Sequence, residues 1–443
     1  MSTLTLVIII VFVVGYICIA TESLLKINKA AIALLMCVFC WTLLMMAPGS
    51  FYPNVAPDGL IGHISEVIEH HLGDAAGTLF FLMGAMTIVE IVDSNGGFNF
   101  VRDALKTRSK RKLMWRVAFM TFFLSAILDN LTTSIVMIMV LRKLVQSRSE
   151  RLIYAALIVI AANSGGAFSP IGDVTTIMLW IKGVITTQGV LTEIFIPSLV
   201  SMVIPAFILQ YSLNGKFDKS QNLPKAEVTQ FTKVQRDIIF WLGVGGLVFV
   251  PIFKTLTHLP PFMGILLVLG ILWTVTEIFH HNTSEDDTMA KRVSDLLSRI
   301  DLSTIMFFLG ILMAVAVLQE IGVLTRLGEG LNEAFNGNHY LVTGIIGVLS
   351  SIVDNVPLVA GCMGMYPVQP TGDMAVDGIF WQLLAYCAGV GGSMLIIGSA
   401  AGVVVMGLEK ITFGWYMKKI TWIAFVGYLA GILCYWLERT FIF

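Results

Sequence analysis

The sequence predicts an all-α polytopic membrane protein built as an inverted repeat, with two re-entrant helical hairpins and two interrupted transmembrane helices. Three observations carry this prediction. The chain is strongly apolar, its basic residues gather on one side of the predicted spans, and its two halves share short motifs in the same order. Together they indicate a chain that lies in a bilayer and repeats itself in the opposite orientation.

Composition identifies the solvent. Of 443 residues, 56% are hydrophobic and 13% are charged, with a mean hydropathy of +0.84. Soluble domains have about 45–50% apolar and about 25% charged residues. A span needs about 20 apolar residues, and apolar runs lie at about 4–21, 29–47, 75–93, 113–142, 152–183, 191–213, 236–253, 261–281, 301–320, 341–361, 379–409 and 420–438. Residues 1–443 are therefore predicted to form a single membrane domain.

The first apolar run and the net charge of the chain provide two further predictions. The first run has no basic leading region or small-residue cleavage site, so it is predicted to be a span rather than a signal peptide. A net charge of −1 provides no field for nucleic acid. The predicted partners are the lipid bilayer and small cations.

Six cysteines lie almost entirely in apolar runs, and the paired histidines His70-His71 and His280-His281 are predicted to be solvated loop residues at span ends.

The run 113–142 is predicted to be a hairpin. The loop 48–74 contains no Lys or Arg, whereas 102–112 is densely basic and so is predicted to be cytoplasmic. Arg142, Lys143, Arg148 and Arg151 follow the run, so both of its ends are basic. The segment should therefore enter and leave on the cytoplasmic side.

The run 341–361 shows the opposite pattern. Its flanks, 329–339 and 366–377, contain no Lys or Arg, which predicts a second hairpin that enters from outside. The resulting topology places every one of the 28 Lys and Arg residues in the cytoplasm except Lys182, Lys254, Arg326 and Arg439. Both termini then face outward.

An internal repeat supports the same topology. Residues 75–213 are predicted to form a first repeat, with hairpin 113–142 and broken helix 152–183, and residues 301–443 an inverted second repeat, with hairpin 341–361 and broken helix 379–409. Residues 1–74 and 214–300 are predicted to supply scaffold helices and a linker. Four motifs recur about 226 residues apart: Phe80-Phe81-Leu82 as Phe307-Phe308-Leu309, Leu128-Asp129-Asn130 as Val353-Asp354-Asn355, Gly165-Gly166 as Gly391-Gly392, and Ile171-Gly172 as Ile397-Gly398.

Glycine clusters mark where the long helices break. Residues 163–170 and 389–399 interrupt equivalent spans with paired glycines. Broken backbone inside a membrane is tolerated where it lines a cavity, and inverted repeats place their binding site there. Close helix packing would explain isolated glycines, but it explains paired clusters at equivalent places poorly.

Acidic residues dominate the charged groups within the spans. Glu90, Asp93, Asp129, Asp173 and Asp354 are predicted to lie at depth, where Lys182 is the only basic residue that could share their level. Acids that lack cationic partners inside a membrane must bind a proton, bind a metal ion or stay hydrated. This pattern is typical of proton-coupled cation binding.

Hard oxygen ligands that suit sodium surround these acids. The cation- and proton-binding residues are predicted to be Asp129, Asn130, Thr132, Thr133, Asn163, Asp173, Thr175, Thr176, Asp354 and Asn355, with Na+ at Asp129, Asp173, Thr133 and Thr176. Secondary positions are predicted at Ser125, Ser169, Ser350, Ser351, Ser393, Ser399 and Glu90. A packing hydrogen bond, worth about 0.6–2 kcal/mol in a membrane, is the better explanation of an isolated Ser, Thr or Asn. For the residues that follow Asp129, and for their counterparts, the clustering favours ligation.

At these residues the chain resembles the NhaD-type sodium/proton antiporters of the ion transporter superfamily, which also includes arsenite and dicarboxylate permeases. The motifs are Ser125 to Thr133, Asn163 to Thr176, Ser351 to Pro357 and Gly391 to Ser399. The resemblance implies an inverted-repeat transporter of the bacterial inner membrane that exports Na+ or Li+ against inward H+ flow. It also implies a homodimer whose hairpin-bearing region moves in an elevator-like manner. No cofactor is expected.

Two alternatives compete with this interpretation. A dicarboxylate or oxyanion carrier on the same fold would meet the negative charge of Asp129 and Asp354 at the hairpin tips, where the tips of dicarboxylate-carrying relatives resemble Ser-Asn-Thr. An intramembrane aspartyl protease also needs two buried aspartates that share a proton. Its Tyr-Asp and Gly-x-Gly-Asp motifs are replaced here by Leu-Asp-Asn, Val-Asp-Asn and Ile-Gly-Asp. We therefore expect a transporter rather than an enzyme.

Overall fold

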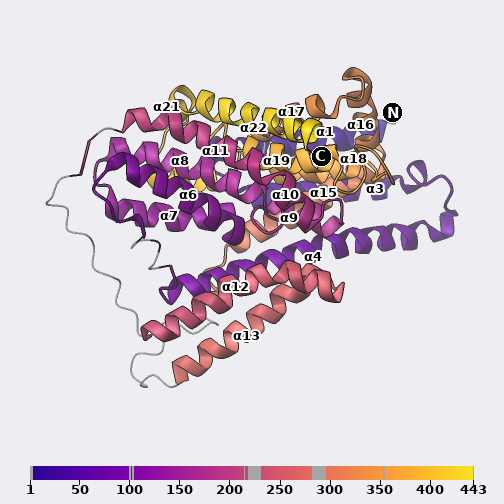
Figure 1. Cartoon of the computed structure of the whole chain (residues 1–443). Coiled ribbons are helices and arrows are strands. Elements are labelled where there is room, and N and C mark those ends of the chain that lie inside the picture. The colour runs from indigo at the N-terminus through magenta and orange to yellow at the C-terminus, as the bar shows by residue number, and fades with distance from the viewer. Residues whose placement is uncertain are drawn as a thin grey trace.

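The computed structural model describes residues 3–98, 101, 104–213, 215–217, 231–281, 296–352 and 355–442, and this part of the chain is built of helices (Figure 1). Seven of the described helices are long and apolar enough to cross a membrane. The first half contains α1 (Thr3–Ala20), α2 (Glu22–Leu25), α3 (Lys29–Met46), α4 (Leu60–Ser94), α6 (Lys110–Leu128), α7 (Asn130–Leu144), α8 (Arg148–Ala167), α9 (Val174–Lys182), α10 (Thr187–Glu193) and α11 (Phe195–Leu209).

The second half repeats the order of helix types. It contains α12 (Lys233–Thr257), α13 (Pro261–His281), α15 (Leu302–Glu320), α16 (Val323–Ala334), α17 (His339–Ser350), α18 (Asn355–Met365), α19 (Ile379–Gly391), α20 (Ala400–Glu409), α21 (Phe413–Lys419) and α22 (Thr421–Phe441). The predicted fold class, an all-helical inverted repeat with two hairpins and two interrupted helices, is confirmed.

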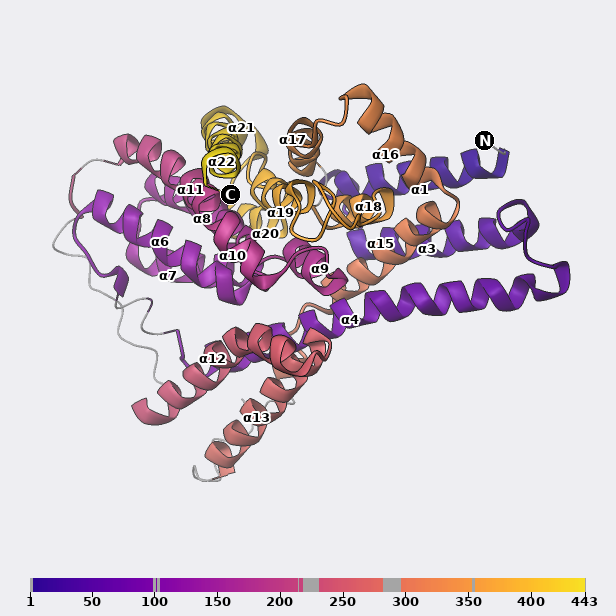
Figure 2. The same ribbon diagram turned by 45° about the vertical axis from the view of Figure 1, so that its right-hand side comes forward.

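Two helices form the centre of the molecule. Every residue of α8 from Tyr154 to Ala167 is buried, and so is every residue of α19 from Phe380 to Gly391. A helix that is apolar and buried on all sides must be enclosed by other helices. Hairpin helix α6 packs along α8, and α17 packs along α19 in the equivalent way. Figure 2 shows α6, α7 and α8 side by side.

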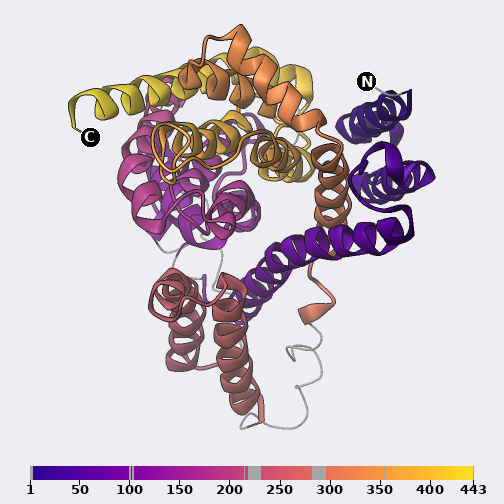
Figure 3. The same cartoon turned by 90° about the vertical axis from the view of Figure 1, so that its right-hand side faces the viewer.

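The leading helices of the two halves are exchanged. Helices α1 and α3 of the first half pack on α15 of the second, whereas α12 and α13 pack on α4 of the first half. Figure 3 shows α12 and α13 beside α4, with α1 and α3 on the other side near α15. This exchange ties the halves together, and it is invisible to the motif comparison because the leading helices carry no recurring motif.

Ion pairs show that both ends of the first hairpin reach one face. Lys110 Nζ at the start of α6 lies 2.6 Å from Glu150 Oε1 at the start of α8. Arg142 at the end of α7 and Arg151 on α8 each lie 2.7 Å from a carboxylate oxygen of Glu409. The hairpin therefore starts and ends on the side that the basic flanks predict to be cytoplasmic.

The second hairpin starts and ends on the opposite face. His339 Nδ1, at the start of α17, lies 2.9 Å from Asp373 Oδ2. Just beyond α18, Tyr366 donates a hydrogen bond to the Gly328 carbonyl. The two arms are more widely separated than those of the first hairpin, because α18 packs on α15, α16 and α9 rather than along α17.

Two sequence expectations are wrong at the end and start of α4. The segment predicted as loop up to residue 74 is helical from Leu60, so α4 extends well beyond its apolar run (Figure 2). Glu90 was expected to lie among acids without a basic partner, but Arg299 Nη1 is 3.5 Å from its Oε1. Ser94 donates a hydrogen bond to the same oxygen. Glu90 therefore lies near the cytoplasmic end of α4 and is paired with a basic residue.

Candidate cation-binding site

The tip of the first hairpin is a single residue in an unusual conformation. Asp129 joins α6 to α7 with φ 77° and ψ 160°, a region that residues other than glycine rarely occupy. Its Oδ1 accepts from the Thr132 backbone N–H at 2.8 Å, and its Oδ2 accepts from the Thr132 hydroxyl at 2.9 Å. Asp129 and Thr132 thus form the N-terminal cap of α7.

The first broken helix presses against this hairpin. Gly165 lies so close to the Phe122 carbonyl that a Cβ would collide with it, and a Cβ on Gly172 would lie 2.7 Å from the Ser125 carbonyl. After the break, Asp173 caps α9 by accepting from the Thr175 N–H at 3.2 Å. Only glycine allows this approach of backbone to backbone.

The second repeat has the same construction with one chemical change. Gly391 lies against the Gly347 carbonyl, and a Cβ on Gly398 would lie 2.5 Å from the Ser351 carbonyl. The capping residue of α20 is Ser399, whose Oγ accepts from the Gly402 N–H at 3.2 Å. Ser399 therefore stands where the first repeat has the carboxylate of Asp173.

Side chains from both hairpins and both broken helices meet at the centre. Asn130 Nδ2, at the start of α7, donates to Asn163 Oδ1 at 3.0 Å and to Asp173 Oδ2 at 3.1 Å. Asn355 Nδ2, at the start of α18, lies 3.5 Å from the same Asp173 oxygen. Asn163 Nδ2 donates to Ser393 and Ser399 at 3.0 and 2.9 Å. We call these six residues, Asn130, Asn163, Asp173, Asn355, Ser393 and Ser399, the central cluster.

The central cluster lies at the start of four helices. Asn130 and Asn355 are the first residues of α7 and α18, and Asp173 and Ser399 cap α9 and α20. Each helix N-terminus carries roughly half a positive charge. The buried carboxylate of Asp173, 1% exposed, is stabilised by these dipoles and by the two amides.

Hydroxyl groups with spare capacity lie next to the central cluster. Thr133, Thr175 and Thr176 are fully buried. In the described part of the chain, the Oγ1 atoms of Thr133 and Thr175 have no hydrogen-bond partner, and Thr176 reaches only the Ala167 carbonyl at 3.5 Å. A buried hydroxyl without a partner is costly unless something else satisfies it. These oxygens are available as ligands.

The structure separates the other predicted residues from the central cluster. Ser125 and Ser350 donate to the Ala162 and Ala388 carbonyls and so fasten each hairpin to its broken helix. Ser351 donates to the Val348 carbonyl, and Ser169 accepts from the Ile171 N–H within the first break. Asp354 lies outside the described residues. Among the described residues, the Asp129 carboxylate bonds to Thr132 rather than to the central cluster.

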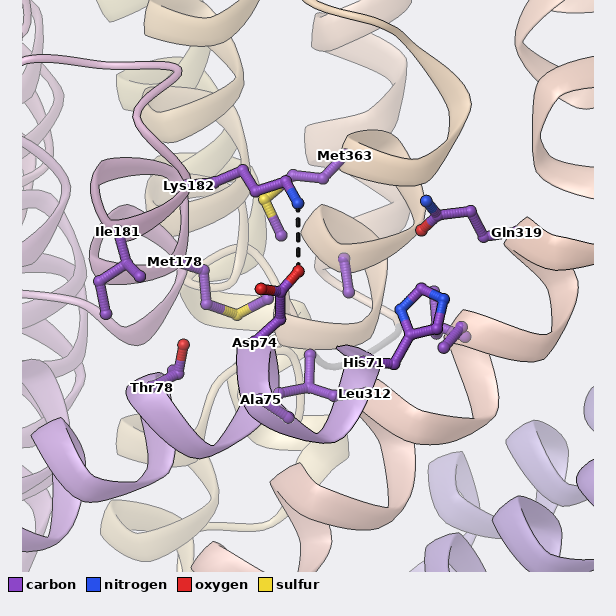
Figure 4. Close-up of a pocket in the computed structure, with 13 residues that line it drawn as sticks. His71, Asp74, Ala75, Thr78, Met178, Ile181, Lys182, Leu312, Gln319 and Met363 are labelled. Atoms are coloured by element: carbon purple, nitrogen blue, oxygen red, sulfur yellow. Dashed lines mark hydrogen bonds and ion pairs between the residues drawn. The ribbon is translucent and has the colours of Figure 1, made fainter. Parts of the chain in front are cut away.

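A polar cavity of about 390 Å³ lies on the outward side of the central cluster, between α4, α9, α15 and α18. Met178 and Ala360 line it, each five residues beyond Asp173 or Asn355, which is about 7–8 Å along a helix. Figure 4 shows Lys182 Nζ of α9 across from Asp74 Oδ2 of α4, 3.3 Å apart. We call this space the outer vestibule and this ion pair the vestibule bridge.

Comparison with known proteins agrees with this architecture. A family model described as citrate transporter matches residues 16–383. The chain is 41% identical to Sodium/proton antiporter 2 of Arabidopsis thaliana, covering 96% of this chain and 98% of the relative. It is 31% identical to the Na(+)/H(+) antiporter NhaD of Alkalimonas amylolytica, covering 97% and 89%.

The chain belongs to the transporter family whose model matches residues 16–383, and these sodium/proton antiporters are its relatives. Its resemblance to NhaD-type transporters is confirmed by these relatives, and it is a multi-pass membrane protein. A solved structure of the YdaH transporter of Alcanivorax borkumensis, described as having an unusual topology, shares the fold with a TM-score of 0.59 at 12% identity, over 92% of this chain and 98% of that one.

Sequence reasoning missed the polar residues of the outer vestibule. His71, predicted as a solvated loop residue, lies within α4, and its Nε2 is 2.9 Å from Glu320 Oε1. Tyr52 donates to the other oxygen of Glu320 at 2.8 Å, and burial, together with this hydrogen bond to an acid, raises the pKa of the Tyr52 hydroxyl. The apolar run does not reveal these contacts, because α4 begins 15 residues before the run and this extension brings polar side chains to the vestibule.

Proposed function

We propose that this NhaD-type transporter exchanges cytoplasmic Na+ or Li+ for external H+ by secondary active transport, with Asp173 at its centre. The observation that supports this most directly is that amides from both hairpins converge on one buried carboxylate. A carboxylate so placed can bind either a proton or a cation. The names of the relatives, sodium/proton antiporters, point to the same exchange.

The amides of the central cluster suggest how binding could couple to movement. Asn130 and Asn355 donate N–H groups to Asp173 in the observed arrangement. A sodium ion at that carboxylate requires oxygen ligands, so each amide must turn its oxygen inward. Because the two amides belong to different hairpins, cation binding would change how both hairpin tips are held.

Threonine hydroxyls complete a plausible ligand set. Thr133 provides a buried oxygen without a partner among the described residues, and Thr176 provides a buried oxygen whose hydrogen bond to the Ala167 carbonyl is long, at 3.5 Å. Asp129 adds negative charge at the start of α7, one residue before Asn130. We propose that Asp173 with Thr133 and Thr176 binds the cation and that Asp129 contributes mainly charge and the cap of α7.

The outer vestibule would connect this site to the outside. Its lining includes Asp74, Thr78, Lys182 and Gln319, and its inner wall is formed by helices that begin at the central cluster. The vestibule bridge joins α9 to α4 in this arrangement. We propose that this bridge breaks when the hairpin-bearing region moves to expose the site to the cytoplasm.

A dicarboxylate or oxyanion carrier on the same fold fits less well, although the family model is described as citrate transporter. Four helix N-termini without acids would favour an anion. Here Asp129 and Asp173 occupy two of these N-termini. A dianion would therefore meet carboxylates, which repel it at close range.

Everted membrane vesicles provide the test. Respiration acidifies their lumen, and added Na+ or Li+ should release the stored protons when this protein is present. Citrate added as the choline salt should release none and should not accumulate. Citrate uptake without a cation response would contradict the proposal.

Location and assembly remain part of the proposal. The concentration of basic residues on one face supports a multi-pass protein of the bacterial inner membrane. A homodimer is proposed from the resemblance to NhaD-type antiporters, and native mass spectrometry of the purified protein would test it.

A further inference from the structure

A second cavity, of about 660 Å³, lies on the cytoplasmic side between hairpin helix α6 and scaffold helix α12. Its walls differ from those of the outer vestibule. Phe123 and Ile127 of α6 face Phe240, Trp241 and Val244 of α12 across it. We call it the inner-leaflet pocket, because a wall of aromatic and aliphatic groups suits a hydrocarbon chain rather than a hydrated ion.

Two cations stand at the cytoplasmic mouth of this pocket. Lys233 and Arg236 line it together with one acid, Asp237, so its lining is net positive. The Nε of Arg236 is buried and has no hydrogen-bond partner in the described part of the chain. Arg236 makes no ion pair or side-chain hydrogen bond with the described residues. A buried guanidinium N–H without an acceptor is costly, and a phosphate oxygen is the acceptor that matches its geometry.

The depth of the pocket matches one lipid leaflet. Lys233 begins α12 at the predicted cytoplasmic face, and Val244 lies 11 residues further along the helix, which is about 16 Å. Half of a hydrocarbon core is about 15 Å. Leu128, beside the hairpin tip at Asp129, forms part of the inner wall.

The pocket is open toward the bilayer. Trp241 is 70% exposed and Phe123 is 49% exposed, whereas Phe98 and Leu128 behind them are buried. Phe98 packs edge-on against Phe240 with ring centroids 6.1 Å apart, which forms a firm back wall. A lipid chain could therefore enter sideways without unfolding any helix.

We propose that the inner-leaflet pocket binds an anionic phospholipid of the cytoplasmic leaflet. Its phosphate accepts hydrogen bonds from Arg236 and Lys233, and one acyl chain lies between α6 and α12 against Phe123, Ile127 and Val244. The occupant bridges the hairpin to the scaffold. This inference is independent of which substrate the protein carries.

Native mass spectrometry of the purified full-length protein tests the proposal with dioleoyl phosphatidylglycerol, dioleoyl phosphatidylcholine and inorganic phosphate as probes. Phosphatidylglycerol should bind in preference to phosphatidylcholine. Arg236→Gln should weaken this binding roughly tenfold, the loss expected for a charge-assisted hydrogen bond. Arg236→Lys should retain most of it because the charge remains.

The control is Lys112→Gln, which removes an exposed cytoplasmic cation that does not line the pocket. Its lipid binding should equal that of the unmodified protein. Thermal unfolding in detergent verifies that the Arg236 variants fold. If only the Gln variant fails to fold, the preference of the unmodified protein for phosphatidylglycerol over phosphatidylcholine decides the proposal.

Four results would overturn the proposal. Equal binding of both lipids would exclude selection for an anionic headgroup, and unchanged binding by Arg236→Gln would place the lipid elsewhere. Arg236-dependent binding of inorganic phosphate without retention of phosphatidylglycerol would indicate a soluble-anion site. Efficient disulfide cross-linking between copies carrying Trp241→Cys would show that a second copy of the chain covers the pocket.

Discussion

At the scale of single residues, Asp173 is the residue on which the proposed exchange depends most. It is buried, it caps α9, and it accepts from Asn130 and Asn355 of the two hairpins. Replacement by Asn preserves size and can still cap a helix, but it removes the charge. Loss of this charge should impair transport more than it lowers the stability of the protein.

We expect Asp173→Asn to abolish cation-dependent proton release in everted vesicles while the protein still inserts and elutes at its normal size. The charge that offsets the cost of dehydrating sodium is lost, and so is the group that binds the proton. Glu90→Gln is the matched control, because Glu90 pairs with Arg299 away from the central cluster. Normal exchange by Asp173→Asn would mean that another carboxylate carries the ion.

The threonine hydroxyls should tune affinity rather than decide activity. Thr133→Ala removes a buried oxygen that has no partner among the described residues, so the protein should not lose stability. Loss of one neutral ligand should raise the sodium concentration for half-maximal exchange roughly tenfold, with exchange restored at high sodium.

Thr121→Ala provides the control for this change. Its hydroxyl is equally buried and also lacks a partner in the described part of the chain, but it lies on α6 before Ser125 and outside the central cluster. The same shift in both variants would assign the effect to general packing and remove Thr133 from the ligand set.

Residue types could be predicted better than their pairings. Asp129, Asp173 and their Asn and Thr neighbours were found because acids and amides are conspicuous in apolar runs. The sequence could not show that Asn163 bridges to Ser393 and Ser399, since that contact crosses about 230 positions and depends on how two broken helices meet. The partner of Glu90 was missed for the same reason.

At the scale of the elements, glycines at equivalent crossings decide whether hairpin and broken helix can touch. Gly165 and Gly391 lie against carbonyls of α6 and α17, where a methyl group would force backbone apart. Overpacking of this kind costs about 1–3 kcal/mol. The elements and their breaks could be predicted because such glycines come in pairs.

We expect Gly165→Ala and Gly391→Ala each to lower the thermal unfolding temperature by several degrees and to impair exchange. Gly270→Ala, in the middle of α13 with open space around its Cα, should be neutral or slightly stabilising because alanine favours helix by up to about 1 kcal/mol. Differential scanning fluorimetry in detergent measures all three. Equal stability of the Gly165 and Gly270 variants would show that the crossing is loose.

The vestibule bridge should affect the position of α9 more than its stability. Asp74 and Lys182 are both about half exposed, so their ion pair should stabilise the protein by at most about 1 kcal/mol. Asp74→Asn and Lys182→Gln should therefore shift the balance between transporter states by no more than about fivefold. Unfolding temperatures should stay unchanged.

External thiol labelling of Met363→Cys, which lines the vestibule, reports that balance. The double variant should change the labelling rate no more than either single variant, because one interaction is removed in all three. Additive changes would indicate that the two residues act separately and that no bridge governs access.

At the scale of the whole molecule, the exchange of leading helices makes the repeat more than two similar halves. Helices α12 and α13 hold α4, and α1 and α3 hold α15, so each half is braced by the other. The charge of the loops and the order of the motifs predicted the inverted repeat. The leading helices are uniformly apolar, so their sequences do not indicate which helices they pack against. The two broken helices differ in their capping residue, because Asp173 caps α9 after the first break whereas Ser399 caps α20 after the second. Only the first break therefore carries a carboxylate at its helix cap.

That asymmetry leads to a prediction about protons and sodium in the complete transporter. If both compete for the carboxylate of Asp173, the sodium concentration for half-maximal exchange should rise as pH falls, by up to about tenfold per pH unit for each shared carboxylate. The sign follows because a protonated carboxyl carries no charge to offset sodium. Measurements in everted vesicles across the acidic limb of activity give this slope, and Asp74→Asn, a vestibule change outside the central cluster, should leave it unaltered. A slope of zero would require separate paths for the proton and the cation, whereas a slope near two would mean that a second acid, such as Asp129, releases its proton with Asp173.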